Sequence, residues 1–269
     1  MAIVSEIVYD KIIESLNNFN GLAIECESYI SEKFPNLPKL TLRSIISKHG
    51  QNLTKLFYSK NHNKAAQLAQ EFQNRMKNER SMLHMAMDYN CPPVTLCRII
   101  LNEKFSKADV KEMLKDPDLI PDPLLSANVY TCLFNDNQDG IIIDMIRVSI
   151  GEEYELRLKK LARDAGLIFY DEQDLRRARF DKTPDLLLAV QCMYKNTLIN
   201  WIESKASFGD IESHKKYLND QLISYTNRFG PGIVLYWFGF HEEILNKTKN
   251  LIILDSFPAN EEFQKLTFQ

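Results

Sequence analysis

Three residues that could act together in phosphodiester chemistry lie on two neighbouring segments of the chain. Asp185 follows Thr183 and Pro184, while Glu203 and Lys205 stand two positions apart in a later apolar segment. In a β-strand, residues i and i+2 point to the same face, so Glu203 and Lys205 emerge side by side. If the two segments pair as a hairpin, Asp185 reaches the same place. We therefore expect the three side chains to share one pocket.

These three residues would suit metal-assisted hydrolysis. Two converging carboxylates form a hard-oxygen site for Mg²⁺ or Mn²⁺, and such a metal polarises a phosphodiester and activates water. A lysine beside it stabilises charge that grows on the phosphate. The sequence motif alone is not specific, because Pro-Asp occurs three times in the chain. The alternative interpretation of Glu203 and Lys205 is an exposed cross-strand ion pair that contributes little to stability.

Nearby residues extend the candidate site. In the spacing Gly151-x₃-Glu155-x₁₀-Gly166, Glu155 falls on the first turn of a predicted helix and could supply a third oxygen ligand. An ordinary solvent-facing acid is an equal alternative for Glu155.

A second predicted helix, 213–228, carries His214, Gln221 and Tyr225 at spacings that share one face. Gln221 and Tyr225 could touch a substrate phosphate or steady Lys205, and we include His214 and Tyr225 among the candidate nucleic-acid contacts. The alternative is that this face packs on the sheet.

The elements around these residues predict an α+β chain in two parts. Apolar residues recur at helical spacing through the first 150 residues. After Gly151 the pattern predicts a helix over 152–165, strands over 167–170, 185–190 and 198–206, the helix 213–228, and strands over 233–240 and 251–255. The order αβββαβ is typical of a small mixed sheet flanked by helices. We place one domain over 1–150 and the other over 151–269.

The helical part contains two possible helix-turn-helix units. One is 39–58, which we expect to form two short helices separated at Gly50, and the other is 81–105, with a turn at Cys91-Pro92-Pro93. The specificity of this pattern is low, because any all-helical domain contains helical hairpins.

Charge is distributed unevenly along the chain. Residues 39–80 hold nine basic and two acidic side chains, although the whole chain has a net charge of −3. A basic segment inside an acidic chain is a candidate contact for a polyanion such as DNA. The alternative is a solvated helix face. The candidate phosphate-binding residues are Lys48, Lys55, Lys60 and Lys64.

Composition excludes several classes of protein. No apolar run approaches the roughly 20 residues of a membrane span, and we expect no secretory leader. The five cysteines are scattered without a C-x-x-C pair, which favours buried thiols in an intracellular protein over a disulfide framework or a zinc site.

Longer motifs carry a resemblance to a known family. Pro184-Asp185, Glu203-Ser204-Lys205 and Gln221-x₃-Tyr225 resemble the P-D-(D/E)-x-K nuclease superfamily, and the Gly151-to-Gly166 spacing is similar to archaeal Holliday-junction resolvases. The segments DKTPD (181–185), WIESKASFGD (201–210), YLNDQ (217–221) and NRFGPG (227–232) resemble the codanin-interacting nuclease family with its T-P-D motif. The resemblance extends through most of the chain.

The resemblance implies a helix-turn-helix-bearing half joined to a restriction-endonuclease-like half. It implies Asp185 and Glu203 as metal ligands, with Glu155 as a further one, and Lys205 as the catalytic lysine. It also implies a codanin-like protein partner, a nuclear and cytoplasmic location and a link to chromatin assembly. Trp201 shares the strand face of Glu203, where it could stack on a base or pack in the core.

These inferences predict a Mg²⁺- or Mn²⁺-dependent nuclease that cleaves structured DNA, with the helical half providing nucleic-acid or partner contacts. The competing hypothesis is a nuclease-fold adaptor that binds a protein partner and nucleic acid without strong catalysis. A transcription factor lacks support, because nothing marks a dimerising or base-reading helix. DNA against RNA, endonuclease against exonuclease action and the oligomeric state stay open.

Overall fold

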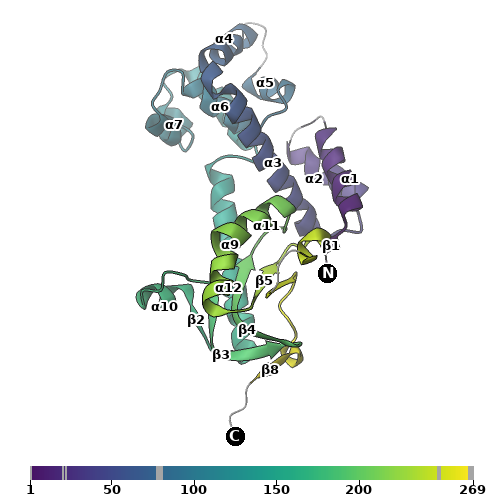
Figure 1. Ribbon diagram of the computed structural model, residues 1–269. Coiled ribbons are helices and arrows are strands. Elements are labelled where there is room, and N and C mark those ends of the chain that lie inside the picture. Colours follow the sequence, from purple (N-terminus) through teal and green to yellow (C-terminus); the bar gives the residue numbers. More distant parts are fainter. Residues whose placement is uncertain (1, 20, 22, 77–80, 247–249, 266–269) are drawn as a thin grey trace. The chain divides into compact units, whose positions relative to one another are not determined.

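The computed structural model describes residues 2–19, 21, 23–76, 81–246 and 250–265 (Figure 1). The chain forms two compact units, one over residues 12–147 and one that joins the residues up to 11 with those from 148 onward. The predicted boundary near Gly151 falls inside helix α9 (Ile141–Asp164), which is one continuous helix rather than two. The start of the chain belongs with the sheet, which the sequence pattern did not predict.

The unit over residues 12–147 is helical. Its elements are the end of α1 (Glu6–Asn17), α2 (Ala23–Lys33), α3 (Lys39–Asn61), the 3₁₀ turn η1 (His62–Lys64), α4 (Ala65–Met76), α5 (Met82–Asp88), α6 (Pro93–Leu101), α7 (Lys107–Met113), the 3₁₀ turn η2 (Pro117–Leu119), α8 (Pro123–Phe134) and the start of α9. Their apolar faces meet in one core around Met82, Leu96 and Val129.

Gly50 does not interrupt the helix in which it lies. The prediction of two short helices over 39–58 is wrong, because α3 is a single helix of 23 residues. A Cβ at Gly50 would come within 2.4 Å of the Gln138 side-chain oxygen. The glycine therefore makes room for a neighbouring side chain, and a single glycine costs a helix only about 1 kcal/mol.

The second helical hairpin, α5 and α6, cannot present a reading helix to a DNA groove. Eight of the nine residues of α6 are buried, and only Arg98 is partly exposed. Asp136 accepts a hydrogen bond from the Val94 backbone at 2.9 Å, and Asp139 pairs with Arg98 at 2.9 Å. Since α6 is the central element of this core, the expected helix-turn-helix role of 81–105 is wrong.

The other unit is a mixed sheet with helices. Its elements are β1 (Ile3–Val4), the start of α1, most of α9, β2 (Phe169–Asp171), α10 (Glu172–Arg177), β3 (Leu186–Tyr194), β4 (Thr197–Lys205), α11 (Ile211–Tyr217), η3 (Leu218–Leu222), α12 (Ile223–Phe229), β5 (Gly232–Tyr236), β6 (Phe240–His241), η4 (Glu242–Asn246), β7 (Leu251–Leu254), η5 (Asn260–Glu262) and β8 (Phe263–Lys265). The main sheet has the order β2-β3-β4-β5-β7, with β8 paired to β3. Strands β2, β3 and β4 are antiparallel, whereas β4, β5 and β7 are parallel.

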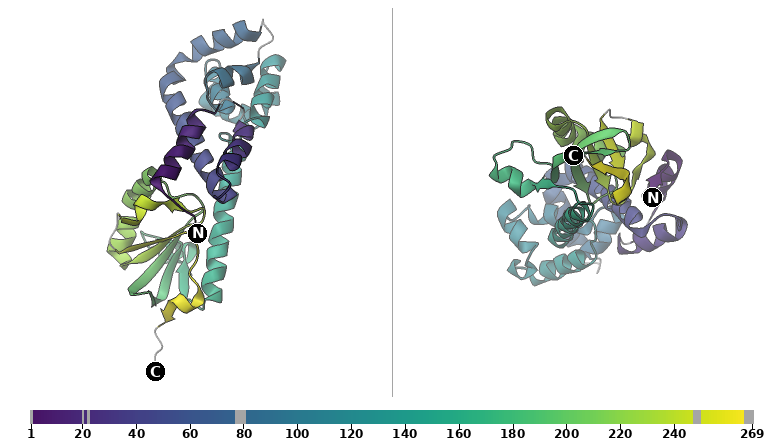
Figure 2. Two further views of the ribbon diagram at one scale, coloured as in Figure 1. Left: turned by 90° about the vertical axis from the view of Figure 1, so that its right-hand side faces the viewer. Right: turned by 90° about the horizontal axis from the view of Figure 1, so that it is seen from below.

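Helices cover both faces of this sheet (Figure 2). Leu158 and Ala162 of α9 pack against one face in a core with Leu186 and Ile233. Residues of the α11–α12 region pack on the other face against Trp201, Val234 and Tyr236. The predicted α+β class and the helical-then-stranded order of the chain are confirmed.

Strands β3 and β4 form the hairpin that the sequence predicted. They are joined by Lys195, which has a positive φ of 52°, and Asn196. Leu186 pairs with Ile202 and Leu187 with Trp201, but the next printed pair is Cys192 with Ile199. Four residues of β3, Leu188–Gln191, therefore face the single residue Asn200 of β4, which makes a wide bulge. Bulges of this kind redirect side chains beside functional sites.

The end of α12 is shaped by two glycines. The helix ends at Gly230, whose φ of 89° is unfavourable for other residues. A Cβ at Gly232 would lie 2.2 Å from the Trp201 ring, so only glycine lets β5 pass under that indole. The Trp201 Nε1 donates to the Gly230 carbonyl at 2.8 Å, which holds the ring in place.

The beginning of the chain completes the sheet-bearing unit. Strand β1 pairs in parallel with β6, so that Ile3 lies opposite Phe240. The Ala2 backbone N–H donates to Asp255 at 2.6 Å, and the Glu6 N–H donates to Glu242 at 2.9 Å.

Two composition-based predictions can be compared with the structure. All five cysteines are buried and none of them forms a disulfide, as expected of thiols that behave as small apolar side chains. Among the described residues, no helix combines the length and apolar character that crossing a bilayer requires.

Candidate active site

The β3–β4 hairpin brings Asp185, Glu203 and Lys205 into one hydrogen-bonded cluster. Lys205 Nζ donates to Glu203 Oε1 at 2.8 Å. The Asp185 backbone N–H donates to Glu203 Oε2 at 3.2 Å, and Asp185 Oδ2 accepts from the Ser204 backbone N–H at 2.7 Å. In the last two bonds, a backbone N–H of each segment holds the carboxyl group of the other, so the hairpin keeps the two carboxyl groups together.

The cluster is buried and rich in charge. Glu203 is 4% exposed, and Lys205 is largely covered. Burial raises the pKa of Asp185 well above its ordinary value, and the neighbouring charge of Glu203 raises it further. Burial alone would lower the pKa of Lys205, but Glu203 and Asp185 outweigh burial and raise it, so the ammonium form is retained. Two carboxylates thus share a single covered cation.

Gln221 and Tyr217 hold the other side of the Lys205 ammonium. Lys205 Nζ donates to Gln221 Oε1 at 3.1 Å and lies 4.6 Å from the centre of the Tyr217 ring. Gln221 belongs to η3, a π-helical turn inserted between α11 and α12. Turns of this type are rare and occur frequently at functional sites. The sequence predicted that Gln221 steadies Lys205, although it did not reveal the π turn.

The T-P-D loop is held from two directions. The Tyr225 hydroxyl donates to the Thr183 carbonyl at 3.4 Å, and the Thr183 hydroxyl donates to Glu172 at 3.4 Å. Glu172 begins α10, a short helix absent from the sequence prediction. Asp171 and Asp174 form a reciprocal capping box at its start, so the spacing Asp-x-x-Asp was the signal that could have located it.

Glu155 acts on the two carboxylates through its charge. Partial burial raises its pKa, and the charges of Glu172 and Glu203 add to this effect. However, within the described part of the chain no three Asp, Glu, His or Cys side chains converge closely enough to hold one metal ion. The expectation that Glu155 completes a three-ligand set is therefore corrected: the converging pair is Asp185 and Glu203.

The donor set of this pair fits a hard divalent cation. Asp185 Oδ1 has no hydrogen-bond partner among the described residues, while Oδ2 and both Glu203 oxygens accept hydrogen bonds. Burial and then repulsion from the Glu203 carboxylate raise the pKa of Asp185. A cation bound between them would relieve that repulsion, and oxygen ligands are those that Mg²⁺ and Mn²⁺ prefer.

Three residues expected near the substrate lie instead in the core. His214 is 1% exposed, with Nδ1 2.9 Å from the Tyr236 hydroxyl, and Tyr225 is 6% exposed against Trp201. Their assignment as nucleic-acid contacts is wrong, because the helix face that they share is the one that packs on the sheet. Trp201 is fully buried, so the core-packing alternative holds for it.

Some basic side chains of the segment 39–80 already form ion pairs within the protein. Arg43 pairs with Glu27 at 2.6 Å, and Arg75 pairs with Glu71 at 2.7 Å. The candidate lysines lie on α3 and just after it. Lys55, Lys60 and Lys64 are exposed and Lys48 is partly buried. Their role in binding phosphate stays a prediction.

The fold and the site together define an α+β protein with a buried acid–acid–lysine cluster on an antiparallel hairpin. A family model described as "Protein of unknown function TPD sequence-motif" matches residues 121–257, which include this cluster. Proteins called CDAN1-interacting nuclease 1 are similar over most of the chain. The protein from Xenopus laevis is 37% identical over 94% of this chain and 88% of its own length. The human protein is 39% identical over 86% of this chain and 87% of its own length.

The chain therefore belongs to the CDAN1-interacting nuclease 1 family, and the resemblance to the T-P-D-motif family is confirmed. The relative from Danio rerio is 36% identical over 88% of this chain. No solved structure matches the chain significantly.

Proposed function

We propose that this protein is a divalent-metal-dependent nuclease of the P-D-(D/E)-x-K type that hydrolyses phosphodiester bonds in structured DNA. The observation that carries the proposal is the convergence of Asp185, Glu203 and Lys205 across the β3–β4 hairpin. The αβββαβ order of elements around the hairpin and the word nuclease in the names of the relatives also support it.

Each residue has a role in this proposal. Asp185 and Glu203 would hold Mg²⁺ or Mn²⁺, which when bound polarises the phosphodiester and activates water. Lys205 keeps a positive charge beside the position of the phosphate and stabilises negative charge that develops there. Gln221 and Tyr217 fix the Lys205 ammonium so that little reorganisation is needed.

The experiment is a cleavage assay with purified protein and labelled forked, junction and linear DNA. Each substrate is incubated with Mg²⁺, with Mn²⁺ or with a chelator. We expect metal-dependent cleavage that is lost in Asp185→Asn and Lys205→Ala. Removal of one such group typically costs a factor of at least about 100 in rate. Cleavage that persists in both variants, or in chelator, would come from a contaminant and would overturn the proposal.

The second candidate function is a nuclease-fold adaptor. Its support is the first part of the relatives' name, since these proteins are called CDAN1-interacting. We infer a codanin-like protein partner for this chain, in nucleus and cytoplasm and in connection with chromatin assembly. Co-purification of that partner with a wild-type protein that cleaves none of the DNA substrates would favour the adaptor.

A further inference from the structure

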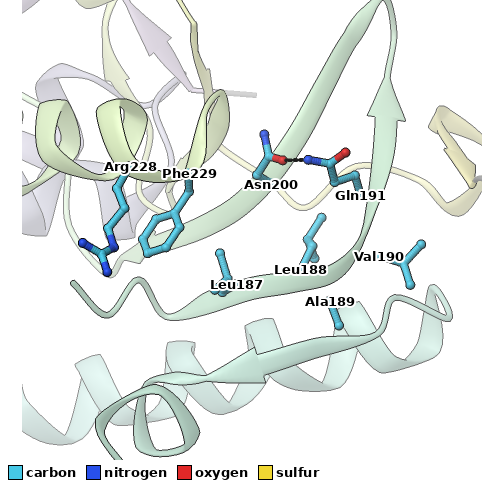
Figure 3. A pocket seen from close by; sticks show the side chains of 8 residues that line it. All are labelled: Leu187, Leu188, Ala189, Val190, Gln191, Asn200, Arg228 and Phe229. Atoms are coloured by element: carbon cyan, nitrogen blue, oxygen red, sulfur yellow. Dashed lines mark hydrogen bonds between the residues drawn. The ribbon is translucent and has the colours of Figure 1, made fainter. Parts of the chain in front are cut away.

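An open groove lies where β3 bulges away from β4. Its volume is about 540 Å³, and its walls include Leu187, Gln191, Asn200, Arg228 and Phe229. Figure 3 shows Arg228 and Phe229 extending from α12 at one end, the Gln191–Asn200 pair at the other, and Leu187 on the strand between them. The mechanism proposed above uses none of these five residues.

The groove begins two strand residues from the candidate active site. Leu187 is two residues after Asp185 and packs in the core that lies on the α12 face of the sheet. Two residues of a strand span roughly 7 Å and return to the same face. If a phosphate of a polymeric substrate lies beside Asp185, the next unit of that polymer lies in the groove.

One end of the groove offers flat, polarisable surfaces. The Arg228 guanidinium lies 5.8 Å from the centre of the Phe229 ring and 5.9 Å from that of Phe180. Phe180, at 37% exposure, lies 6.4 Å from Phe229 between ring centres. Unpaired nucleobases pack on aromatic rings and on arginine guanidinium planes.

The charge at this end is available to a ligand. Arg228 pairs with Asp181 at 2.9 Å, but the side chains are 48% and 61% exposed. Exposed pairs of this kind contribute at most about 1 kcal/mol, so a phosphate can compete for the guanidinium.

The other end of the groove carries an amide that is held in one orientation. Gln191 Nε2 donates to Asn200 Oδ1, and Asn200 Nδ2 donates to the Pro231 carbonyl at 3.2 Å. Asn200 is buried and committed on both sides, whereas Gln191 is exposed and its Oε1 has no partner among the described residues. A fixed amide with a free acceptor can hydrogen-bond the edge of a base.

We propose that this groove binds an unpaired nucleotide adjoining the cleaved phosphodiester, so that the substrate class is DNA with a single-stranded segment next to a duplex. This inference rests on the proposed function for its biological setting. The reason for a single strand is physical: a base inside a duplex has both faces stacked and cannot lie on Phe229, whereas an unpaired base exposes a face to it.

The test measures binding apart from cleavage. Fluorescence anisotropy in chelator gives the affinity for a labelled duplex with a short single-stranded flap and for the blunt duplex of the same sequence. The variants are Arg228→Gln, Arg228→Lys and Gln191→Ala, all at exposed positions. The matched control is Arg163→Gln, which removes the same charge from an arginine that lies 5.6 Å from the Phe169 ring, in the core that α9 covers.

We expect the wild type and the control to prefer the flap by about tenfold, the lower range of a stacked base. Arg228→Gln and Gln191→Ala should lose most of that preference and keep their affinity for the blunt duplex. Arg228→Lys should recover only part of it, because lysine keeps the charge but not the plane. Equal affinity of the wild type for both DNAs, or a preference unchanged in all three variants, would overturn the inference.

The same assay separates this inference from the proposed nuclease activity. A flap preference that depends on Arg228, in a protein that cleaves nothing with Mg²⁺ or Mn²⁺, supports the groove and rejects the nuclease. Metal-dependent cleavage of flap and blunt DNA with no difference in affinity supports the nuclease and rejects the groove.

Discussion

At the scale of single residues, the cluster of Asp185, Glu203 and Lys205 holds two carboxyl groups in an unfavourable buried arrangement. Asp185 and Glu203 are held together by backbone hydrogen bonds, and burial together with the Glu203 charge raises the pKa of Asp185. Structures commonly keep such repulsion only where function requires it, and stabilising substitutions at such sites commonly remove activity.

The first prediction therefore concerns Asp185→Asn. In chelator this variant should be more stable than the wild type by about 1 kcal/mol, since it removes one of two repelling charges and keeps an oxygen for the Ser204 N–H. With excess Mg²⁺ the difference should shrink or reverse, because only the wild type gains from binding the ion. Thermal unfolding with and without Mg²⁺ measures both, and a variant less stable in chelator would contradict the repulsion.

At this scale, the sequence predicted correctly which residues share a face wherever the period of a strand or helix determines it. Glu203 and Lys205 follow from the two-residue period of a strand. His214 and Tyr225 were placed correctly on one helix face but assigned to the wrong environment, because spacing gives a face and not what covers it. Glu155 could not be judged, since its distance from Glu203 depends on how α9 lies on the sheet.

At the scale of elements, some glycines lie inside continuous helices and others allow a close contact, and the sequence did not distinguish the two kinds. Gly151 was interpreted as a boundary and Gly50 as a break, yet both lie within continuous helices. Gly232 was noted only within the NRFGPG segment, but a Cβ at this position would lie 2.2 Å from the Trp201 ring. Propensity is local, whereas these roles depend on which side chain lies above each backbone position.

The second prediction compares two glycine substitutions. Gly232→Ala would place its Cβ 2.2 Å from the buried Trp201 ring, so it should destabilise the protein by about 2–3 kcal/mol. Gly151→Ala meets nothing within 4 Å inside α9 and should stabilise it by about 0.5–1 kcal/mol. Urea unfolding of the two variants beside the wild type measures the difference. Effects of equal sign would show that Trp201 moves aside or that α9 is not continuous.

The third prediction concerns the anchor of α6. Burial raises the pKa of Asp136 to about 6 from 3.8. Because the native pKa exceeds the unfolded one, the folded protein binds the proton more tightly. The associated stability is present below pH ~4 and is lost as the pH rises through ~6. The unfolding free energy of wild type relative to Asp136→Asn should fall by up to about 3 kcal/mol across that interval.

Asp139→Asn provides a control of opposite sign. Burial alone would raise the pKa of Asp139, but the Arg98 guanidinium outweighs it and lowers the pKa. Its stabilisation is therefore present above its unfolded pKa and lost as the pH falls through the lower native value. Urea unfolding should show the Asp136 effect between pH ~4 and ~6 and the Asp139 effect, of opposite sign, only below pH ~4. If either variant gave a curve parallel to that of the wild type in its own pH interval, the pKa shift assigned to that aspartate would be wrong.

At the scale of the whole molecule, positive charge is concentrated in one segment, residues 39–80, and not in a whole compact unit. The basic segment lies within residues 12–147, while the acidic cluster of Asp185 and Glu203 lies in the other unit. Composition predicted this asymmetry fully, because counting charges needs no structure. It could not predict that Arg43 and Arg75 are already paired with glutamates.

The fourth prediction is that Lys48, Lys55 and Lys60 contact DNA phosphates. Replacing all three with glutamine should weaken DNA binding and reduce the slope of log K against log salt by about 0.9 for each lysine that contacts a phosphate. Affinities over a range of salt concentrations measure the slope. As a control, Lys104, Lys107 and Lys111 are exposed lysines of the same unit, and their replacement should leave it unchanged. Equal losses in both variants would indicate a general charge effect.

The pairing of β1 with β6 has a consequence for biosynthesis. Glu6 and its hydrogen-bond partner Glu242 are 236 positions apart, so the first strand leaves the ribosome long before the segment that receives it. At about 5–20 residues per second, that interval is roughly 10–50 seconds. Residues 12–147 are continuous in sequence and complete during the interval. The nascent chain thus finishes one compact unit while the first strand of the other waits, and that other unit can close only after β6 has been synthesised.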